Sequence, residues 1–242
     1  MAHGAPDYYS SSPKSVVHAL QDMAELAARL KSVVTFDRRG DVIALADFSD
    51  DLGQWDATPN GVGASIARAT TVARSSPGSV NMVPGNANGD QSIIVRSGGI
   101  TSTGRFGVEV SWTSAGNTSW LLGSENSYFE AASGYSLDWR YNNATKALQI
   151  KLLGGAWQTI ATTDFGVTAL FWHTFKLVAD VDTGKYVRAI LDGATIDLSA
   201  YSLPTVASNV QYGYGQTLFV ERIAAGIISL YLDDILFTIN EP

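Results

Sequence analysis

The sequence predicts an all-β protein, an antiparallel jelly-roll sandwich preceded by one N-terminal α-helix. Short runs with the two-residue alternation of strands recur throughout residues 41–242, and turn-forming dipeptides separate them. No helical pattern intervenes between these runs, which is typical of sandwiches and jelly rolls. The chain also lacks the fixed-period repeat that would indicate a propeller or a solenoid.

The N-terminal helix is expected over about residues 15–34, after a polar arm. The arm lacks the basic start and apolar segment of a signal peptide. Apolar residues in the helix recur at alternating steps of four and three, at Val16, Leu20, Met23, Ala27, Leu30 and Val34. A helix of this length is marginal alone in water, so the stripe must be buried. The helix packs either on its own domain or against the same helix of other chains in a parallel coiled coil. In the second case we expect a homotrimer.

Charge divides the chain into the same two parts. Residues 1–40 contain five Lys or Arg and four Asp or Glu, whereas residues 41–242 contain eleven and nineteen. The first part is therefore nearly neutral and the second carries a net charge of −8. We expect residues 1–40 to be an anchoring and oligomerisation module and residues 41–242 to form the sandwich.

The strands of the sandwich are expected wherever alternating or apolar runs occur between turn signals. The turn signals are Pro77-Gly78, Asn88-Gly89, Asn142-Asn143, Gly154-Gly155, Thr183-Gly184 and Asp192-Gly193. The expected strands are Val42–Phe48, Gly63–Ala69, Ser79–Val83, Ser92–Arg96, Phe106–Trp112, Trp120–Leu122, Tyr135–Tyr141, Ala147–Leu153, Trp157–Thr162, Phe171–Asp180, Tyr186–Leu191, Thr195–Leu198, Leu218–Ala224 and Ile227–Ile239.

Composition excludes several classes of function. The chain has 242 residues, no cysteine and a net charge of −7. Without cysteine there are no disulfides, thiolate metal sites or cysteine nucleophiles. No run approaches the roughly 18 apolar residues of a membrane-spanning helix, so we expect no membrane insertion. The acidic balance argues against nucleic acid as a partner, because phosphate binding requires a basic face.

Three stretches of the body resemble known jelly rolls. Residues 46–55, in which Asp47-Phe48 leads to Trp55, resemble the opening strand of concanavalin A-like and carbohydrate-binding jelly rolls. Residues 172–193 are similar to the hairpins of laminin G-like and pentraxin-like domains, and residues 231–237 resemble the terminal strand, which pairs beside the first. The resemblance implies the fold rather than an activity, because lectins, hydrolases, lyases and structural proteins share it.

The N-terminal part resembles a different class of protein. Its short arm, its helix and the junction Thr35–Val42 are similar to the starts of tailed-phage virion proteins, where such a module anchors a displayed jelly roll. The resemblance implies a non-enzymatic virion structural protein, such as a capsid decoration, fibre or adhesin subunit at the virion surface. Its partner would be a capsid or tail protein bound through the arm. The alternative is an extracellular, lectin-like protein that binds polysaccharide.

A glycan-cleaving enzyme is the third and least favoured interpretation. Retaining glycosidases need two carboxylates about 5–5.5 Å apart, which on one strand requires alternate positions. The available carboxylates include Glu109, Glu125, Glu130 and Asp138, and none has this spacing. The three histidines lie far apart and have no metal-ligand partner at helical or strand spacing. We therefore predict no catalytic residues.

Calcium is the ion that the sequence favours. Asp47, Asp233 and Asp234 fall at the ends of the expected first and last strands, which this fold brings together. Carboxylate and carbonyl oxygens are its usual ligands, and the resembling jelly rolls often hold a structural calcium near such positions. The other interpretation is that these aspartates cap turns on the surface.

The aromatic residues suggest a glycan-binding patch. The chain has six tryptophans and ten tyrosines, and several lie among serine, asparagine and glycine residues. Sugars pack their apolar face on exposed rings flanked by polar groups. The candidates for this patch are Trp120, Tyr128, Trp139 and Tyr141. The competing interpretation, packing in the core, stays open at this point.

Overall fold

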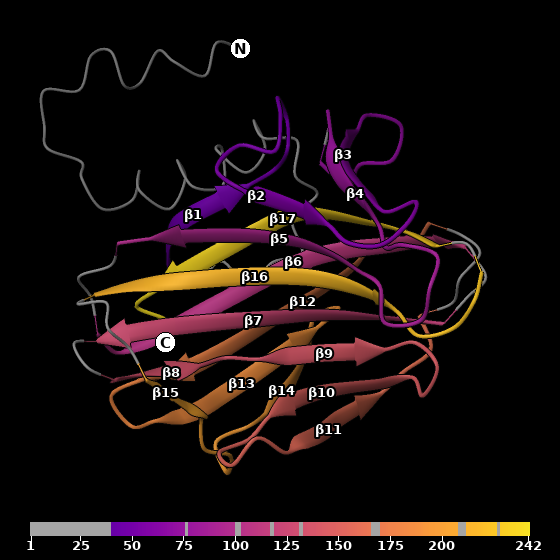
Figure 1. Ribbon diagram of the computed structural model, residues 1–242. Coiled ribbons are helices and arrows are strands. Elements are labelled where there is room, and N and C mark those ends of the chain that lie inside the picture. The colour runs from indigo at the N-terminus through magenta and orange to yellow at the C-terminus, as the bar shows by residue number, and fades with distance from the viewer. Residues whose placement is uncertain are drawn as a thin grey trace, which may run out of the picture. The chain divides into compact units, whose positions relative to one another are not determined.

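A computed structural model describes residues 40–75, 77–99, 103–116, 119–130, 133–165, 170–207, 212–226 and 228–242. These residues form 17 strands in two antiparallel sheets that face each other as two layers (Figure 1). They contain no α-helix, and so no helix long and apolar enough to cross a membrane. The predicted all-β sandwich is confirmed, whereas the predicted helix and its oligomerisation stripe lie outside the described residues.

Sheet A has eight strands, ordered β14-β13-β12-β6-β17-β4-β3, with β1 also paired to β17. They are β1 (Asp41–Ala46), β3 (Ser65–Ala69), β4 (Ser79–Val83), β6 (Arg105–Gly116), β12 (His173–Asp180), β13 (Lys185–Leu191), β14 (Ala194–Asp197) and β17 (Ile228–Ile239). The pairing of β1 with β17, from Asp41 opposite Ile239 to Ala46 opposite Ile235, confirms that the last strand lies beside the first. Residues 47–55, however, which resembled part of an opening strand, belong to no strand.

Sheet B has nine strands, ordered β11-β10-β9-β7-β16-β5-β2, with β8 between β7 and β15. They are β2 (Asp56–Pro59), β5 (Gln91–Gly98), β7 (Trp120–Glu130), β8 (Ser133–Ser136), β9 (Trp139–Asn142), β10 (Ala147–Lys151), β11 (Trp157–Thr162), β15 (Thr205–Ala207) and β16 (Tyr212–Arg222). Two of these were not expected, β2 with four residues and β15 with three.

The expected strand Tyr135–Tyr141 is in fact two strands, because the chain leaves β8 after Ser136 and enters β9 at Trp139.

The turn signal at Asp192-Gly193 forms the expected turn. Asp192 and Gly193 both adopt positive φ, 47° and 86°, which is the conformation of a two-residue hairpin turn. This turn joins β13 to β14 at the edge of sheet A.

The core between the sheets is rich in aromatic rings. Trp139 lies 4.8 Å from Phe175 and 6.1 Å from Trp112, measured between ring centroids, so its ring joins the two sheets. The four aromatic residues proposed as a glycan patch also lie in this core, with exposed fractions of 2, 1, 1 and 0% for Trp120, Tyr128, Trp139 and Tyr141. That prediction is wrong, because strand alternation turns all four toward the opposite sheet.

Candidate functional site

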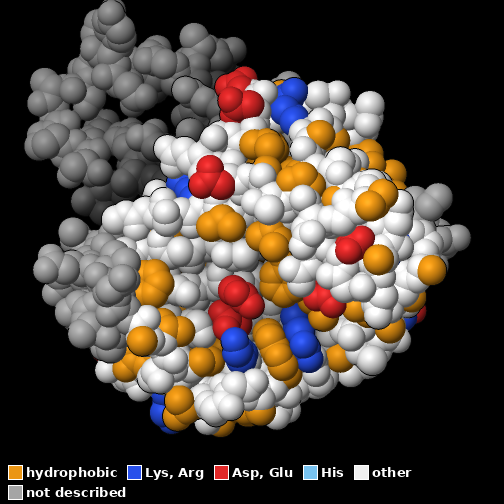
Figure 2. Space-filling view, viewed as in Figure 1, with side chains coloured by type: hydrophobic (Ala, Val, Ile, Leu, Met, Phe, Trp, Pro, Cys, Tyr) orange, Lys and Arg blue, Asp and Glu red, His pale blue; other side chains and the backbone are white. Residues whose placement is uncertain are grey.

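The outer face of sheet B, which points away from the core, carries polar and charged side chains across several strands. Figure 2 looks onto this face and shows acidic and basic side chains beside hydrophobic ones over β7, β9 and β10. Its residues alternate along each strand with the core residues. Glu125, for example, is exposed between the buried residues Ser124 and Asn126 on β7.

One row of this face is defined by the strand register. Thr217 of β16 pairs with Glu125 of β7. The bond from Leu137 N to Asn126 O and the pair Ser124–Trp139 together place Glu125 opposite Asp138. Lys151 N donates to Asp138 O, and Lys151 in turn pairs with Trp157. We call Thr217, Glu125, Asp138, Lys151 and Trp157 the charged row.

A second row runs beside it, formed by Phe219, Gly123, Arg140, Gln149 and Thr159. The ring of Phe219 lies across Gly123, where a Cβ would be 2.3 Å from the ring, so any larger residue would displace the ring. Arg140 Nε donates to Gln149 Oε1 at 2.8 Å, and Gln149 Nε2 donates to Thr159 Oγ1 at 3.1 Å. These bonds fix the Arg140 side chain above the sheet.

Trp157 connects the two rows. The guanidinium carbon of Arg140 lies 4.2 Å from the centre of its ring, and Lys151 Nζ lies 5.9 Å from it. Both distances are within the range of cation–π attraction. The indole is only partly buried, so the face presents an aromatic ring flanked by two cationic groups.

A hollow of about 580 Å³ lies along the charged row. Its volume is within the roughly 300–1,000 Å³ of small-molecule sites. It is lined by Glu125, Ser127, Ser136, Asp138, Lys151, Leu153, Gly154, Gly155, Pro204, Thr205 and Val206. The unexpected strand β15 supplies one wall of it, together with the turn between β10 and β11.

Asp138 is the buried carboxylate of the charged row, at 3% exposed. Its Oδ2 accepts hydrogen bonds from Lys151 Nζ and Ser136 Oγ, both at 3.1 Å, and its Oδ1 accepts one from Asn126 N. Burial raises the pKa of Asp138, and the bonds from Lys151 and Ser136 oppose this only in part. Asp138 therefore holds the Lys151 ammonium in place, while Glu125 stays exposed beside it.

The three aspartates predicted to bind calcium do not form a ligand cluster. The described residues hold no group of three or more His, Cys, Asp or Glu side chains that is arranged for a metal ion. Asp47 Oδ1 accepts a bond from Ser49 N within its own turn. Asp233 and Asp234 are buried, and both are bonded to Ser75. Protein N–H and O–H groups thus already donate to carboxylate oxygens of both residues.

The sequence pattern pointed to Glu125 and Asp138 as carboxylates but not to their being opposite each other, Glu125 on β7 and Asp138 immediately before β9. It missed Arg140, Lys151 and Trp157 altogether. One local signal was available for the last two. The Gly154-Gly155 turn predicts a hairpin, and that hairpin pairs Lys151 with Trp157.

Comparisons with known proteins show the fold. No family model matches the chain, and no curated protein matches its sequence. Among solved structures, a carbohydrate esterase from Shiga toxin-encoding bacteriophage phi24B has a TM-score of 0.56 at 13% identity, covering 84% of this chain and 100% of the esterase.

Two further structures show the same likeness. An endo-β-1,4-glucuronan lyase from the fungus Trichoderma reesei has a TM-score of 0.54 at 12% identity, covering 82% of this chain and 95% of the lyase. The carbohydrate recognition domain of Emp47p has a TM-score of 0.53 at 11% identity, covering 85% of this chain and 99% of that domain. Enzymes and a recognition domain thus share this architecture. The described part of the chain is an all-β antiparallel sandwich of two sheets, and its fold is similar to that of these proteins.

Proposed function

We propose that this protein binds carbohydrate on the outer face of sheet B. The observation that carries the proposal is the partly exposed Trp157 ring, with Arg140 and Lys151 beside it and a hollow that Lys151 lines. The lectin-like alternative is thereby preferred to the virion role as the activity of the sandwich. The likeness to a carbohydrate recognition domain and to glycan-active enzymes supports this choice.

The chemistry of the face matches a sugar. A pyranose offers an apolar face that packs on an aromatic ring, and hydroxyl groups that both donate and accept hydrogen bonds. Lys151 and Arg140 supply donors near the ring, while the exposed Glu125 carboxylate supplies an acceptor. Asp138 keeps Lys151 ordered, so less side-chain entropy is lost on binding.

A glycan array probed with the full chain tests the proposal, followed by titration of the best ligand against two variants. Trp157→Ala should weaken binding by about tenfold or more, as expected for a central aromatic contact. Phe171→Ala is the control, because this ring is 70% exposed but precedes β12 in the other sheet. Absence of binding to every glycan, or equal weakening by both variants, would contradict the proposal.

We also propose that the site binds without cleaving. A general acid must reach the substrate to protonate it, whereas Asp138 is 3% exposed and its side chain is held by Lys151, Ser136 and Asn126. Glu125 therefore has no second carboxylate free to act with it in this hollow. Prolonged incubation with the bound polysaccharide should yield no new chain ends. Cleavage that disappears in Glu125→Gln would show an enzyme instead.

The virion role and the homotrimer stay predictions, because they depend on residues 1–39, which lie outside the described residues. We propose that this segment gathers three chains and attaches them to a capsid or tail protein, so that the sandwich is displayed outward. Mass measurement in solution tests the first step. The full chain should be trimeric and residues 41–242 alone monomeric, while a monomer in both cases would contradict it.

A further inference from the structure

The connection between β3 and β4 is attached to the last strand through two consecutive aspartates. Asp233 and Asp234 are 0 and 3% exposed, and they lie where the register between β17 and β6 shifts. Arg74 and Ser75 of the connection contact both carboxylates. We call these four residues the aspartate clasp.

Every carboxylate oxygen in the aspartate clasp accepts a hydrogen bond. Arg74 N and Ser75 N both donate to Asp233 Oδ2 at 2.9 Å, and Asp234 N donates to Asp233 Oδ1 at 2.8 Å. Ser75 Oγ donates to Asp234 Oδ1 at 2.7 Å, and the Arg74 guanidinium lies 3.3 Å from Asp234 Oδ2. These hydrogen bonds replace only part of the lost hydration, because burial still raises the pKa of both carboxyl groups.

Two neighbouring buried carboxylates also need a positive charge, because their mutual repulsion is strong away from water. The Arg74 guanidinium supplies it, with only 12% of its side chain exposed. Its Nη1 also donates to Ser111 Oγ at 2.5 Å, and Ser111 is fully buried on β6. The guanidinium is thus held between two strands of sheet A in a fixed orientation.

We propose that Arg74 takes the place that a divalent cation would occupy beside Asp233 and Asp234, so that the sandwich is stable without calcium. A calcium ion requires about six to eight oxygen ligands at about 2.3–2.6 Å. The clasp offers two carboxylates whose oxygens already face donors, and a calcium ion entering it would meet the guanidinium. Asp47, the third acidic residue, lies near enough to add to the effect of burial in raising the pKa of Asp234, and its Oδ1 accepts a hydrogen bond from Ser49 N within its own turn.

Thermal unfolding of the full chain tests this directly. The midpoint should agree to within about 1 °C in excess EDTA and in millimolar calcium chloride, since binding to the native state alone would raise it. A rise of several degrees with calcium, reversed by EDTA, would overturn the proposal without any variant.

Arg74→Ser provides the complementary test. Removal of the guanidinium leaves two buried carboxylates without their cation, so the midpoint should fall by on the order of 10 °C. Calcium should then raise the midpoint of this variant, because the vacated position suits a cation. An unchanged midpoint in Arg74→Ser would contradict the role of the guanidinium.

Two further variants complete the design. Arg74→Lys keeps the positive charge, so it should fold even if Arg74→Ser does not, and it should remain insensitive to calcium. Stabilisation of Arg74→Lys by calcium would overturn the proposal. Arg105→Gln is the matched control, because Arg105 pairs with Asp180 at 3.3 Å but is 42% exposed. It should change neither the midpoint nor the response to calcium appreciably.

Discussion

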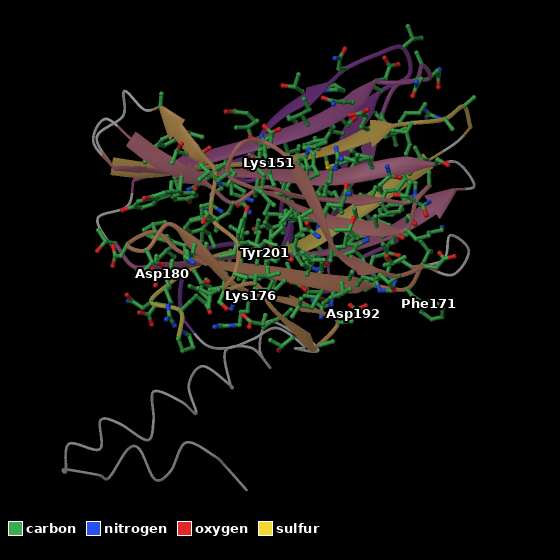
Figure 3. The ribbon with its side chains drawn as sticks, turned by 90° about the horizontal axis from the view of Figure 1, so that it is seen from below. Lys151, Phe171, Lys176, Asp180, Asp192 and Tyr201 are labelled. Atoms are coloured by element: carbon green, nitrogen blue, oxygen red, sulfur yellow. The ribbon has the colours of Figure 1, made fainter. Side chains whose placement is uncertain are left out.

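The two sheets use charged residues on their outer faces in opposite ways. On sheet A, Lys176 Nζ lies 2.6 Å from Glu241 Oε1 and Arg188 lies 2.8 Å from Glu241 Oε2, and all three residues are buried. Figure 3 labels Lys176 on β12 in this sheet and Lys151 on the other sheet. On sheet B, Glu125 is exposed and about a third of the Lys151 side chain is accessible, at 32%.

This difference separates structural charges from available ones. A buried ion pair needs both partners, because an uncompensated charge in the interior is costly. An exposed charge contributes little to stability and is free to meet a ligand. The type of residue is the same on both faces, so burial and partners decide its role.

The largest loss of stability should come from a substitution among the buried charges of sheet A. Glu241→Gln removes the carboxylate that pairs with Lys176 and Arg188, and also with Thr238 Oγ1 at 2.5 Å. The free energy of unfolding should fall by about 3–5 kcal/mol, as when one partner of a buried pair is lost. Chemical denaturation measures this loss, and glycan affinity below the transition should be unchanged. If the free energy of unfolding fell by less than about 1 kcal/mol, the charges on sheet A would be no more important for stability than those on sheet B.

The next effect concerns the exposed face. Lys151→Met removes the cation beside Trp157 and the bond to Asp138, and should weaken glycan binding by about tenfold or more, as loss of a charge-assisted hydrogen bond does. Stability should fall by only about 1–2 kcal/mol, because Asp138 keeps its bonds to Ser136 and Asn126. Calorimetric titration and denaturation give the two values. A large loss of stability without a loss of affinity would assign Lys151 to the structural class.

The third effect depends on pH and comes from Asp138. Its pKa is raised in the folded state, mainly by burial, so the folded protein binds this proton more tightly than the unfolded chain does. The stabilisation that this proton provides is present at low pH and is lost as pH rises through the folded pKa. Relative to Asp138→Asn, the wild type should therefore lose stability as pH rises from about 4. Parallel stability curves for the two proteins would show that the shift is absent.

The smallest effect should come from the exposed ion pair between Arg105 and Asp180. Its N–O distance is 3.3 Å, but 42% of the Arg105 side chain is exposed. Arg105→Gln should change the free energy of unfolding by less than about 1 kcal/mol, and added salt should reduce even this difference. A larger change would mean that exposure alone does not separate the two classes of charge.

Most of the strand pattern could be predicted because it is local. The residues of β4 and β11 match the expected strands, and the Asp192-Gly193 turn adopts the expected conformation. The pairing of β1 with β17 is not local, and it was predicted from the resemblance of the two terminal stretches to jelly rolls. The short strand β15 gave no periodic signal in three residues.

The candidate site could not be predicted, because it is assembled across strands. Thr217 and Glu125 lie side by side only because β16 pairs with β7, and no local pattern fixes that pairing. Nor does alternation by itself say which face of a strand is the core. Trp139 was therefore a candidate both for a surface patch and for the core, while Trp157, on the edge strand β11, was not considered as a site residue.

The pairing of β1 with β17 has a mechanical consequence. Asp41 begins β1 opposite Ile239 at the end of β17, and Asn240 Nδ2 donates to Asp41 Oδ2 at 2.7 Å. Tension applied to the two ends of the sandwich would therefore act at one end of this ladder. Its hydrogen bonds would open one after another, as in a zipper, instead of sharing the force. The sandwich should yield to pulling at its ends well before the aromatic core between the sheets carries any tension.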